Sequence, residues 1–262
     1  MYIRASAKSA ELQRAAEFHV ILPCHDGYPD AEKPFPTLYF LPGYSGNAEE
    51  IIFALPLRQM SAKYGIAVVI PDGENTFYTD HPERACRMGA YAGDELVRIT
   101  RKLFPVLAKE REKTFIGGIS MGGYGALALG LHYRETFSGL VLFSPAAAPD
   151  LLLNGGKKDV EGAVPETLFG ELLGGASVYA ESERLNPSKA VEAYQREGRK
   201  LPPVWMCCGE GDGLVGDACA GFRETLRTAG ADLRWEAGKG GHDLMYWDDH
   251  LENAFRFLAE IA

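Results

Sequence analysis

One serine lies in a pattern that can turn its hydroxyl into a nucleophile. Ser120 is the centre of the segment GISMG at positions 118–122, which has the form G-x-S-x-G. The run 114–116 before it is apolar and β-branched, as in a buried strand, and 122–131 is apolar and rich in small residues, as in a helix packed on a sheet. A strand that turns directly into a helix needs glycines at these two positions, and the turn lifts the serine hydroxyl clear of the backbone.

A serine hydroxyl needs a base to take its proton, and the usual base is a histidine held in one tautomer by a carboxylate. Asp212 and His242 fit these roles because each lies in a glycine-rich loop after an expected strand, and they follow Ser120 in the order acid, histidine. One helix and one strand separate the two loops, so we expect the loops to lie side by side. Asp217 fits less well because it lies within the next helix, and Asp243 is too close to His242 to hold its far nitrogen.

Two backbone amides are expected to bind the oxyanion that forms during acyl transfer. The N–H of Met121 lies in the first turn of the helix after Ser120, where amides are free. The N–H of Tyr44 is the second candidate, because the glycine-bearing loop PGYSGN at 42–47 directly follows the apolar strand 37–41. The alternative is an ordinary strand-to-helix turn in which Asn47 caps the following helix, and both interpretations can hold together.

A further loop, PDGENTFYTD at 71–80, follows the apolar strand 66–70. Ligands of open α/β sheets bind at the carboxyl ends of the strands, so Asn75, Phe77 and Tyr78 are candidates for substrate contacts. The alternative is a surface loop with two packing aromatic residues.

The elements that must position these residues alternate between strand and helix from Thr37 to Phe143. This alternation predicts an α/β fold with a mainly parallel central sheet and helices on both faces. Residues 17–22 are expected to form an early antiparallel strand. Later strands are expected at 139–144, 203–208 and 231–236, and helices at 51–64 (interrupted at Pro56), 91–107, 215–229 and 244–261.

No strand is expected between Pro145 and about Arg199. Glycine pairs at 155–156 and 174–175 divide this region into short helical pieces, and apolar residues at 151–153 and 168–169 give it something to bury. We interpret residues from about 145 to 200 as a small helical cap inserted over the active-site edge of a single domain spanning 1–262. The alternative is a connecting helical segment that never touches substrate.

The composition is that of an ordinary globular protein: 262 residues, 46% hydrophobic, 24% charged, with a net charge of −9. Because no block of lysine or arginine stands out, we expect neither nucleic acid nor a membrane surface as a partner. The start of the chain has no apolar signal segment, which predicts a cytoplasmic protein. The five cysteines show no metal-ligand spacing, and we expect them to be reduced structural thiols.

Four segments together resemble the esterase D-type branch of the α/β-hydrolases. They are LPGYSGN at 41–47, GGISMGGYGA at 117–126, CGEGDGL at 208–214 and GGHDLMYWD at 240–248. That group contains small tributyrin and acetyl esterases, S-formylglutathione hydrolases, feruloyl and acetylxylan esterases, and mycolyltransferases. The resemblance implies an α/β-hydrolase fold with Ser120 as nucleophile, Asp212 as acid, His242 as base, and Tyr44 and Met121 as oxyanion donors.

One position departs from the group's pattern. Pro42 stands where many members have a histidine before the glycine of the oxyanion loop. Proline has no N–H, but the required amide is on the residue after Gly43, so we expect the oxyanion hole to survive.

The resemblance implies a serine carboxylesterase that hydrolyses short-chain acyl esters of small molecules and requires no metal or cofactor. FYTD at 77–80 is most similar to the small tributyrin-type carboxylesterases. One alternative is a carbohydrate acetyl or feruloyl esterase, for which aromatic side chains would form a sugar platform; the candidates are Phe77, Tyr78, Tyr246 and Trp247. Another is an S-formylglutathione hydrolase-like thioesterase, for which the loop after Asp72 is short. The non-enzyme alternative is a binding protein with a vestigial triad, and assembly into a homo-oligomer is left open.

Overall fold

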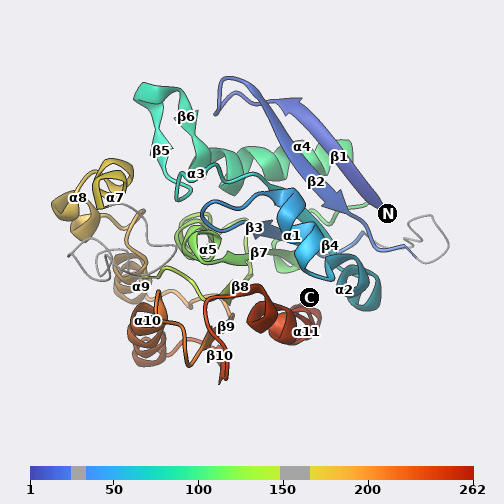
Figure 1. Cartoon of the computed structure of the whole chain (residues 1–262). Helices are drawn as coiled ribbons and strands as arrows, with labels where there is room; N and C mark the ends of the chain where they lie inside the picture. Colours follow the sequence, from blue (N-terminus) through green and yellow to red (C-terminus); the bar gives the residue numbers. More distant parts are fainter. Residues whose placement is uncertain (25–33, 148–165) are drawn as a thin grey trace.

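Eight of the described strands form one sheet that runs through the molecule (Figure 1). The computed structural model describes residues 1–24, 34–147 and 166–262, the side chains of 166–169 excepted. In the sheet the strand order is β1-β2-β4-β3-β7-β8-β9-β10. The strands are β1 (Tyr2–Lys8), β2 (Ala15–Ile21), β3 (Thr37–Leu41), β4 (Ala67–Pro71), β7 (Thr114–Ile119), β8 (Gly139–Phe143), β9 (Val204–Gly209) and β10 (Leu233–Gly238).

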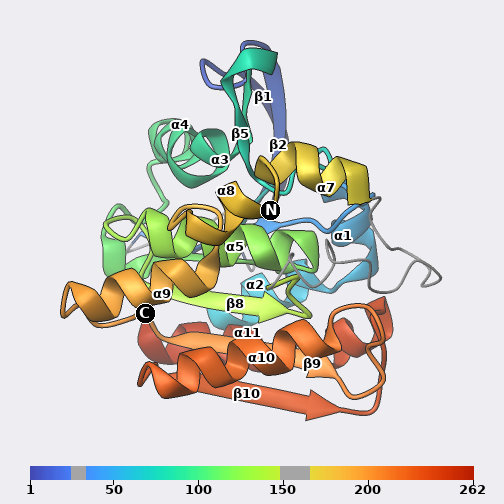
Figure 2. The ribbon, with the colours of Figure 1, turned by 90° about the vertical axis from the view of Figure 1, so that its left-hand side faces the viewer.

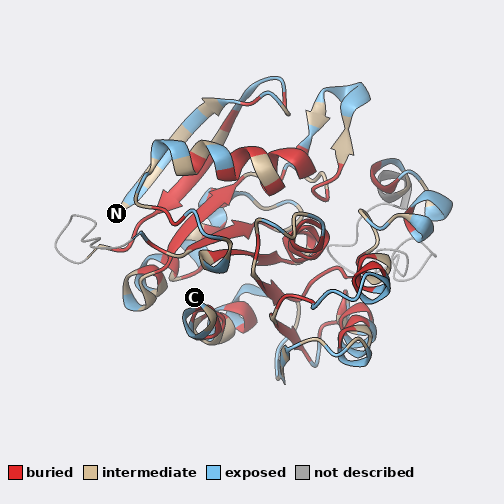
Figure 3. Cartoon of the chain, turned by 180° about the vertical axis from the view of Figure 1, so that it is seen from behind, coloured by how far each residue is buried: buried red, intermediate tan, exposed pale blue. Residues whose placement is uncertain are grey.

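The sheet is parallel from β4 to β10 and antiparallel where β1 and β2 join its edge. Strands β3, β4, β7, β8 and β9 are buried along their whole length, as the red central strands of Figure 3 show. Burial on both faces explains why their sequences are apolar runs without alternation. The predictions of a mainly parallel sheet and of an early antiparallel strand are confirmed.

Strand β1 is an element that the sequence did not predict. Its side chains alternate between exposed and half-buried, and none of them is fully buried. An edge strand with only one half-buried face carries a weak apolar signal, and it is recognised only through its pairing with β2.

Helices cover both faces of the sheet. Buried side chains of α1, α2 and α11 form one apolar cluster with the sheet, and those of α4, α5, α9 and α10 form the other. Within the described ranges, no helix combines the length and the apolarity needed to cross a membrane. The helices are α1 (Ala48–Ala54), α2 (Leu57–Tyr64), α3 (Met88–Ala90), α4 (Leu96–Leu103), α5 (Met121–His132), α7 (Glu166–Leu173), α8 (Ala176–Glu181), α9 (Pro187–Arg196), α10 (Gly216–Thr228) and α11 (Leu244–Ile261).

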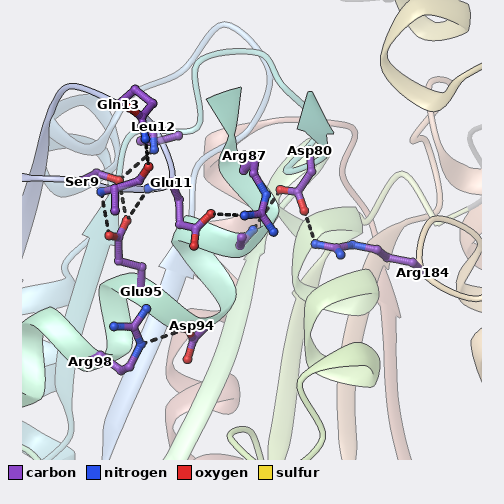
Figure 4. A network of polar contacts seen from close by, with 12 residues as sticks. Ser9, Glu11, Leu12, Gln13, Asp80, Arg87, Asp94, Glu95, Arg98 and Arg184 are labelled. Carbon is purple, nitrogen blue, oxygen red and sulfur yellow. Dashed lines mark hydrogen bonds and ion pairs between the residues drawn. The ribbon is translucent and has the colours of Figure 1, made fainter. Parts of the chain in front are cut away.

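A π-helical turn, Tyr91–Glu95, joins α3 to α4 and ends at a buried carboxylate. Glu95 accepts hydrogen bonds from the hydroxyl of Ser9 and, at 2.8 Å, from the N–H of Ala10 (Figure 4). These bonds fix the turn between β1 and β2 onto the helix. The helix expected at 91–107 therefore begins earlier, at α3, and ends at Leu103.

The region interpreted as a cap contains helices α7, α8 and α9 in its described part, as the glycine pair at 174–175 predicts. The glycine pair at 155–156 and the apolar residues 151–153 lie outside the described residues, as do the side chains of 168–169. Figure 1 shows α7 and α8 on the side of α5 that faces away from the sheet, and Figure 2 views the molecule from that side. The Tyr124 hydroxyl of α5 donates to the carbonyl of Leu185 at 2.6 Å, which ties the segment after α8 to the main body.

A short ribbon projects from the sheet next to this region. Its strands, β5 (Asp80–His81) and β6 (Cys86–Arg87), pair antiparallel. Asp80 forms an ion pair with Arg184, which lies between α8 and α9 (Figure 4). The loop that leaves β4 is thus joined to the cap-like region at its far end.

Candidate active site

Ser120 lies in a sharp turn between β7 and α5. Its backbone has φ 55° and ψ −112°, a conformation that a residue with a side chain rarely adopts. The two flanking glycines allow this turn. A Cβ on Gly122 would lie 1.9 Å from the carbonyl oxygen of Leu41, and one on Gly118 would lie 2.6 Å from the backbone of Gly122. The strained turn expected from the G-x-S-x-G pattern is therefore present.

His242 joins this serine to a carboxylate through two hydrogen bonds. Its Nε2 lies 2.8 Å from the Oγ of Ser120, and its Nδ1 lies 2.8 Å from Oδ2 of Asp212. The loop after β9 carries Asp212, and the loop after β10 carries His242, because these parallel neighbours end at the same edge of the sheet. The structure thus brings together the three residues that the sequence selected.

Asp212 is buried, with 5% of its surface exposed, and backbone amides hold it in place. Its Oδ1 accepts from the N–H of Leu214 at 3.1 Å and of Val215 at 2.9 Å. Burial alone would raise the pKa of this carboxyl, but the hydrogen bond and charge of His242, the Val215 amide and the Ser144 hydroxyl together lower it below its ordinary value. An ionised Asp212 favours the tautomer with a proton on Nδ1, which leaves Nε2 free to accept the proton of Ser120.

The loop after β3 lies directly against the nucleophile. A Cβ on Gly43 would be 3.6 Å from the Cβ of Ser120, so the next residue, Tyr44, follows at the edge of the reacting centre. Met121 is the first residue of α5, and the N–H groups of a helix's first turn have no partner within the helix. For the N–H of Tyr44, the described residues offer no acceptor. Both amides expected at the oxyanion hole are thus placed beside Ser120.

The interpretation of Asn47 as a helix cap is also confirmed. Its side chain accepts from the N–H of Glu50, and the Glu50 carboxylate accepts from the N–H of Asn47. The N–H of Ala48 donates to Asp72 at 2.9 Å. The helix that follows the oxyanion loop is therefore fixed at its first turn.

A cavity of about 960 Å³ opens in front of Ser120 and His242. Part of the wall is apolar and consists of Ile51, Phe53 and Ala54 of α1 and of Leu244 and Trp247 at the start of α11. The lining residues are Gly43, Tyr44, Ser45, Gly46, Asn47, Glu49, Glu50, Ile51, Phe53, Ala54, Ile119, Ser120, Leu214, His242, Leu244 and Trp247. This arrangement places the Ser120 hydroxyl, the His242 imidazole and the loop that carries the Tyr44 amide at one side of the same cavity.

Comparison with known proteins agrees with this geometry. The sequence profile of the Esterase family, described as “Putative esterase”, matches residues 9–258. The chain belongs to the Esterase family. This esterase is a carboxylic ester hydrolase, as the motifs predicted.

Relatives with named activities include two kinds of hydrolase. The esterase is 36% identical to an acetyl esterase of Caldicellulosiruptor saccharolyticus over 231 residues, which cover 86% of this chain and 84% of that enzyme. It is 32% identical to the S-formylglutathione hydrolase of Paracoccus denitrificans over 143 residues. That second match covers 46% of this chain and 50% of the relative, so it spans about half of that enzyme.

A solved structure shares the fold over the whole chain. FphF, a fluorophosphonate-binding serine hydrolase of Staphylococcus aureus, superimposes with a TM-score of 0.84 at 24% identity, covering 99% of this chain and 98% of that one. The mainly parallel sheet of this esterase, with its helices on both faces, is the α/β-hydrolase fold that the four motifs predicted.

The structure does not support the prediction that three residues of the loop after β4 contact substrate. Phe77 and Tyr78, predicted to contact substrate, are 2% and 3% exposed and lie in the apolar core. Asn75 is half-buried, and its Oδ1 accepts from the N–H of Ser45 at 2.6 Å. Since none of the three residues lines the cavity, the geometry favours support of the oxyanion loop over substrate contact. The packing interpretation of the two aromatic residues is correct.

Sequence reasoning missed Ser144 and assigned Trp247 only to a sugar platform, whereas the structure places both residues beside the triad. Trp247 packs edge-on against the His242 ring, with ring centres 5.1 Å apart, and its Nε1 donates to Ser144 Oγ at 3.1 Å. Ser144 is fully buried directly after β8, and its hydroxyl is among the groups that lower the pKa of Asp212. Its position at the carboxyl end of a strand neighbouring both β7 and β9 was the available signal.

All five cysteines are unpaired, as expected for structural thiols. Cys207, Cys208 and Cys219 are buried, and burial raises the pKa of the Cys207 and Cys219 thiols. Cys208 directs its Sγ toward Oδ2 of Asp212 at 3.7 Å, a weak contact between two buried groups.

Proposed function

We propose that this esterase hydrolyses short-chain acyl esters of small molecules through a Ser120-His242-Asp212 triad and an acyl-enzyme intermediate. The observation that carries the proposal is the unbroken chain of hydrogen bonds from Ser120 Oγ through His242 to Asp212, at the wall of the cavity.

The first half of the reaction makes the acyl-enzyme. As the Oγ of Ser120 forms a bond to the ester carbonyl carbon, its proton passes to Nε2 of His242. The carbonyl oxygen becomes an oxyanion, which the amides of Tyr44 and Met121 stabilise. The C–O bond to the leaving group then breaks, and His242 gives the proton to the departing alcohol.

The second half returns the free enzyme. Water replaces the alcohol and loses a proton to His242 as its oxygen bonds to the acyl carbon. Collapse of the second tetrahedral intermediate releases the carboxylic acid and restores the proton to Ser120. The residues of the chain supply every proton transfer in this scheme, so it requires no metal or cofactor.

The charge of the cavity favours neutral esters over S-formylglutathione. Its charged lining residues are two carboxylates, Glu49 and Glu50, and the described part of the lining contains no lysine or arginine. Glu49 is paired with Arg4 at 2.6 Å, while Glu50 takes part in the helix cap. The glutathione moiety carries carboxylates of its own, and like charges at a binding surface disfavour association.

The aromatic residues do not favour a carbohydrate platform. Phe77, Tyr78, Tyr246 and Trp247 are all buried, so none presents an open ring face for a sugar to stack on. Two other aromatic residues line the cavity: Phe53 of α1 is 89% exposed, and Tyr44 is half-buried. An apolar wall of this kind suits a short acyl chain or an apolar alcohol better.

The test is a series of p-nitrophenyl esters from acetate to decanoate, with S-formylglutathione and acetylated sugars measured in parallel. We expect the highest kcat/KM between acetate and butyrate, and loss of turnover in Ser120→Ala with the thermal melting temperature retained. Labelling by a fluorophosphonate should occur in the wild type and not in the variant. A higher kcat/KM for S-formylglutathione than for any simple ester would contradict the substrate assignment, and an unlabelled wild type would contradict the triad itself.

A further inference from the structure

We infer that Tyr78 and Asn75 are positioning residues for the oxyanion hole. This inference rests on the proposed function, since it concerns the amide of Tyr44. The carbonyl of Pro42 accepts a hydrogen bond from the Tyr78 hydroxyl at 2.9 Å, and Ser45 N–H donates to Asn75 Oδ1 at 2.6 Å. These two bonds hold the loop on either side of Tyr44.

The Tyr78 side chain is tightly enclosed, which directs its hydroxyl to the carbonyl of Pro42. A Cβ on Gly73 would lie 2.4 Å from the Tyr78 hydroxyl oxygen, and a Cβ on Gly125 would lie 2.3 Å from its ring. Two glycines therefore shape the slot in which the ring sits. Burial, with the nearby charge of Asp72, raises the pKa of the Tyr78 hydroxyl well above its ordinary value, so the group remains a donor.

Phe77 supports the same loop from below. Its ring centre lies 6.2 Å from that of Tyr44 and 5.9 Å from that of Tyr124 on α5. Tyr44 is thus held by ring packing from the loop that bonds its neighbours Pro42 and Ser45. The apolar contact fixes the direction of the Tyr44 side chain, while the two hydrogen bonds fix the backbone around its amide.

The backbone of the supporting loop is strained, which is itself an indication of this role. Glu74, Asn75, Phe77 and Tyr78 all have φ between 50° and 55°, in the left-handed region. Residues other than glycine remain there only when their surroundings fix them, and such residues cluster at functional sites. Here the fixing contacts are the bonds to Pro42 and Ser45.

The far end of the loop is anchored as well. Asp80 accepts from the N–H of Ala90 at 3.0 Å and forms the ion pair with Arg184 that Figure 4 shows. The loop is therefore fixed at its far end to α3, next to the π-helical turn. Its contacts with Pro42 and Ser45 can then restrain the oxyanion loop.

Loss of this support should affect the transition state and spare the ground state. The Tyr44 amide gains its full bond only when the carbonyl oxygen has become an oxyanion. A loop that is free to shift would therefore lower kcat and leave KM unchanged. Removing an oxyanion donor outright costs about 10²–10³ in kcat, so loosening one should cost less, on the order of tenfold.

The experiment compares Tyr78→Phe with Tyr194→Phe. Tyr194 of α9 is a matched control, because its hydroxyl also donates to a backbone carbonyl, that of Leu131 at 3.2 Å, away from the cavity. We expect Tyr78→Phe to lower kcat for p-nitrophenyl butyrate about tenfold at unchanged KM. The inhibition constant of a trifluoromethyl ketone, which forms a bound oxyanion with the serine, should rise by about the same factor. Tyr194→Phe should change neither.

Asn75 provides a second test at a half-buried position, with the melting temperature of each variant measured alongside. Asn75→Ala removes the acceptor for Ser45 N–H and should lower kcat, whereas Asn75→Asp keeps an acceptor oxygen and should restore it. Equal kcat in the wild type, Tyr78→Phe and Asn75→Ala would overturn the inference, and so would a loss of kcat without a change in inhibitor affinity. Failure of the proposed function is distinguishable, since it would appear as a wild type that neither turns over esters nor reacts with a fluorophosphonate.

Discussion

The two sides of the cavity are built in different ways. On the side of β7, β9 and β10, the reacting groups are side chains, and each stands in a loop directly after a strand. On the side of β3 and β4, the group beside Ser120 is a backbone amide, that of Tyr44, and the aromatic side chains that support it are buried beneath the loop. On the first side the side chains that carry the proposed chemistry reach the cavity, whereas on the second side the supporting side chains are buried.

This difference separates two kinds of mutational effect. When a side chain that transfers or directs a proton is replaced, its function is lost completely, and hydrolysis of every ester becomes slower. Replacing a side chain that holds a backbone amide should remove only part of the stabilisation of the oxyanion, because the amide itself remains. The predictions below test this contrast, beginning with the side where the effect should be larger.

Asp212→Asn should produce the largest change, a loss in kcat on the order of 10⁴ if the triad behaves as others do. An amide in place of the carboxylate can donate to Nδ1 of His242, which favours the wrong tautomer for proton removal from Ser120. The measurement is kcat with p-nitrophenyl butyrate. Asp217→Asn, in the first turn of α10, is the matched control and should retain normal kcat. A kcat for Asp212→Asn within a few-fold of the wild type would reject the assignment of the acid.

Ser144→Ala should have an intermediate effect, about tenfold in kcat, because a hydrogen bond to a charged group contributes on the order of 1.5 kcal/mol. The variant removes a hydroxyl that lowers the pKa of Asp212 and leaves the indole N–H of Trp247 without its acceptor. The protein should also melt at a lower temperature.

Fluorophosphonate labelling of Ser144→Ala tests whether Ser144 belongs to the side-chain half of the site, in contrast to Tyr78, which belongs to the backbone half. Ser144 acts through the triad, so Ser144→Ala should slow fluorophosphonate labelling of Ser120 by about the same factor as turnover. Ser138→Ala, which removes a hydroxyl that bonds backbone carbonyls at the other end of β8, is the control. Unchanged labelling in Ser144→Ala would show that its hydroxyl does not assist the acid.

The smallest expected effect is on the pH dependence of the melting temperature. Because the folded-state pKa of Asp212 lies below its value of about 3.9 in an unfolded chain, its carboxylate stabilises the fold above about pH 4. This contribution is lost as the pH falls through the folded-state pKa. The difference in melting temperature between the wild type and Asp212→Asn should therefore shrink below about pH 4, as thermal melts from pH 3 to 8 would reveal. A difference that stays constant over that range would contradict the lowered pKa.

The sequence predicted the side-chain half of the site more fully than the backbone half. Ser120, Asp212 and His242 could be selected because they follow the G-x-S-x-G pattern and the order serine, acid, histidine, and because their loops follow recognisable strands. Tyr44 and Met121 could be placed by their positions after a glycine and after the serine. Phe77 and Tyr78 were misjudged, since a loop sequence does not reveal which aromatic ring turns inward.

The fold shows the same limit. Buried central strands are evident as apolar runs, whereas β1 and the π-helical turn at Tyr91–Glu95 depend on partners distant in sequence. Ser9 and Glu95, for example, meet only after the sheet has formed. The places of Ser144 and Trp247 beside the triad were missed for a similar reason, because these residues meet each other and the triad only in the folded structure.

Helix α1 has a consequence for how this enzyme can diversify. Its first turn is fixed by Asn47, Glu50 and Asp72, while Phe53 and Ala54 near its end face the cavity from exposed positions. Substitutions at these two sites alter the shape of the wall without disturbing the core or the reacting groups. The shape of this part of the cavity wall is therefore structurally independent of the triad.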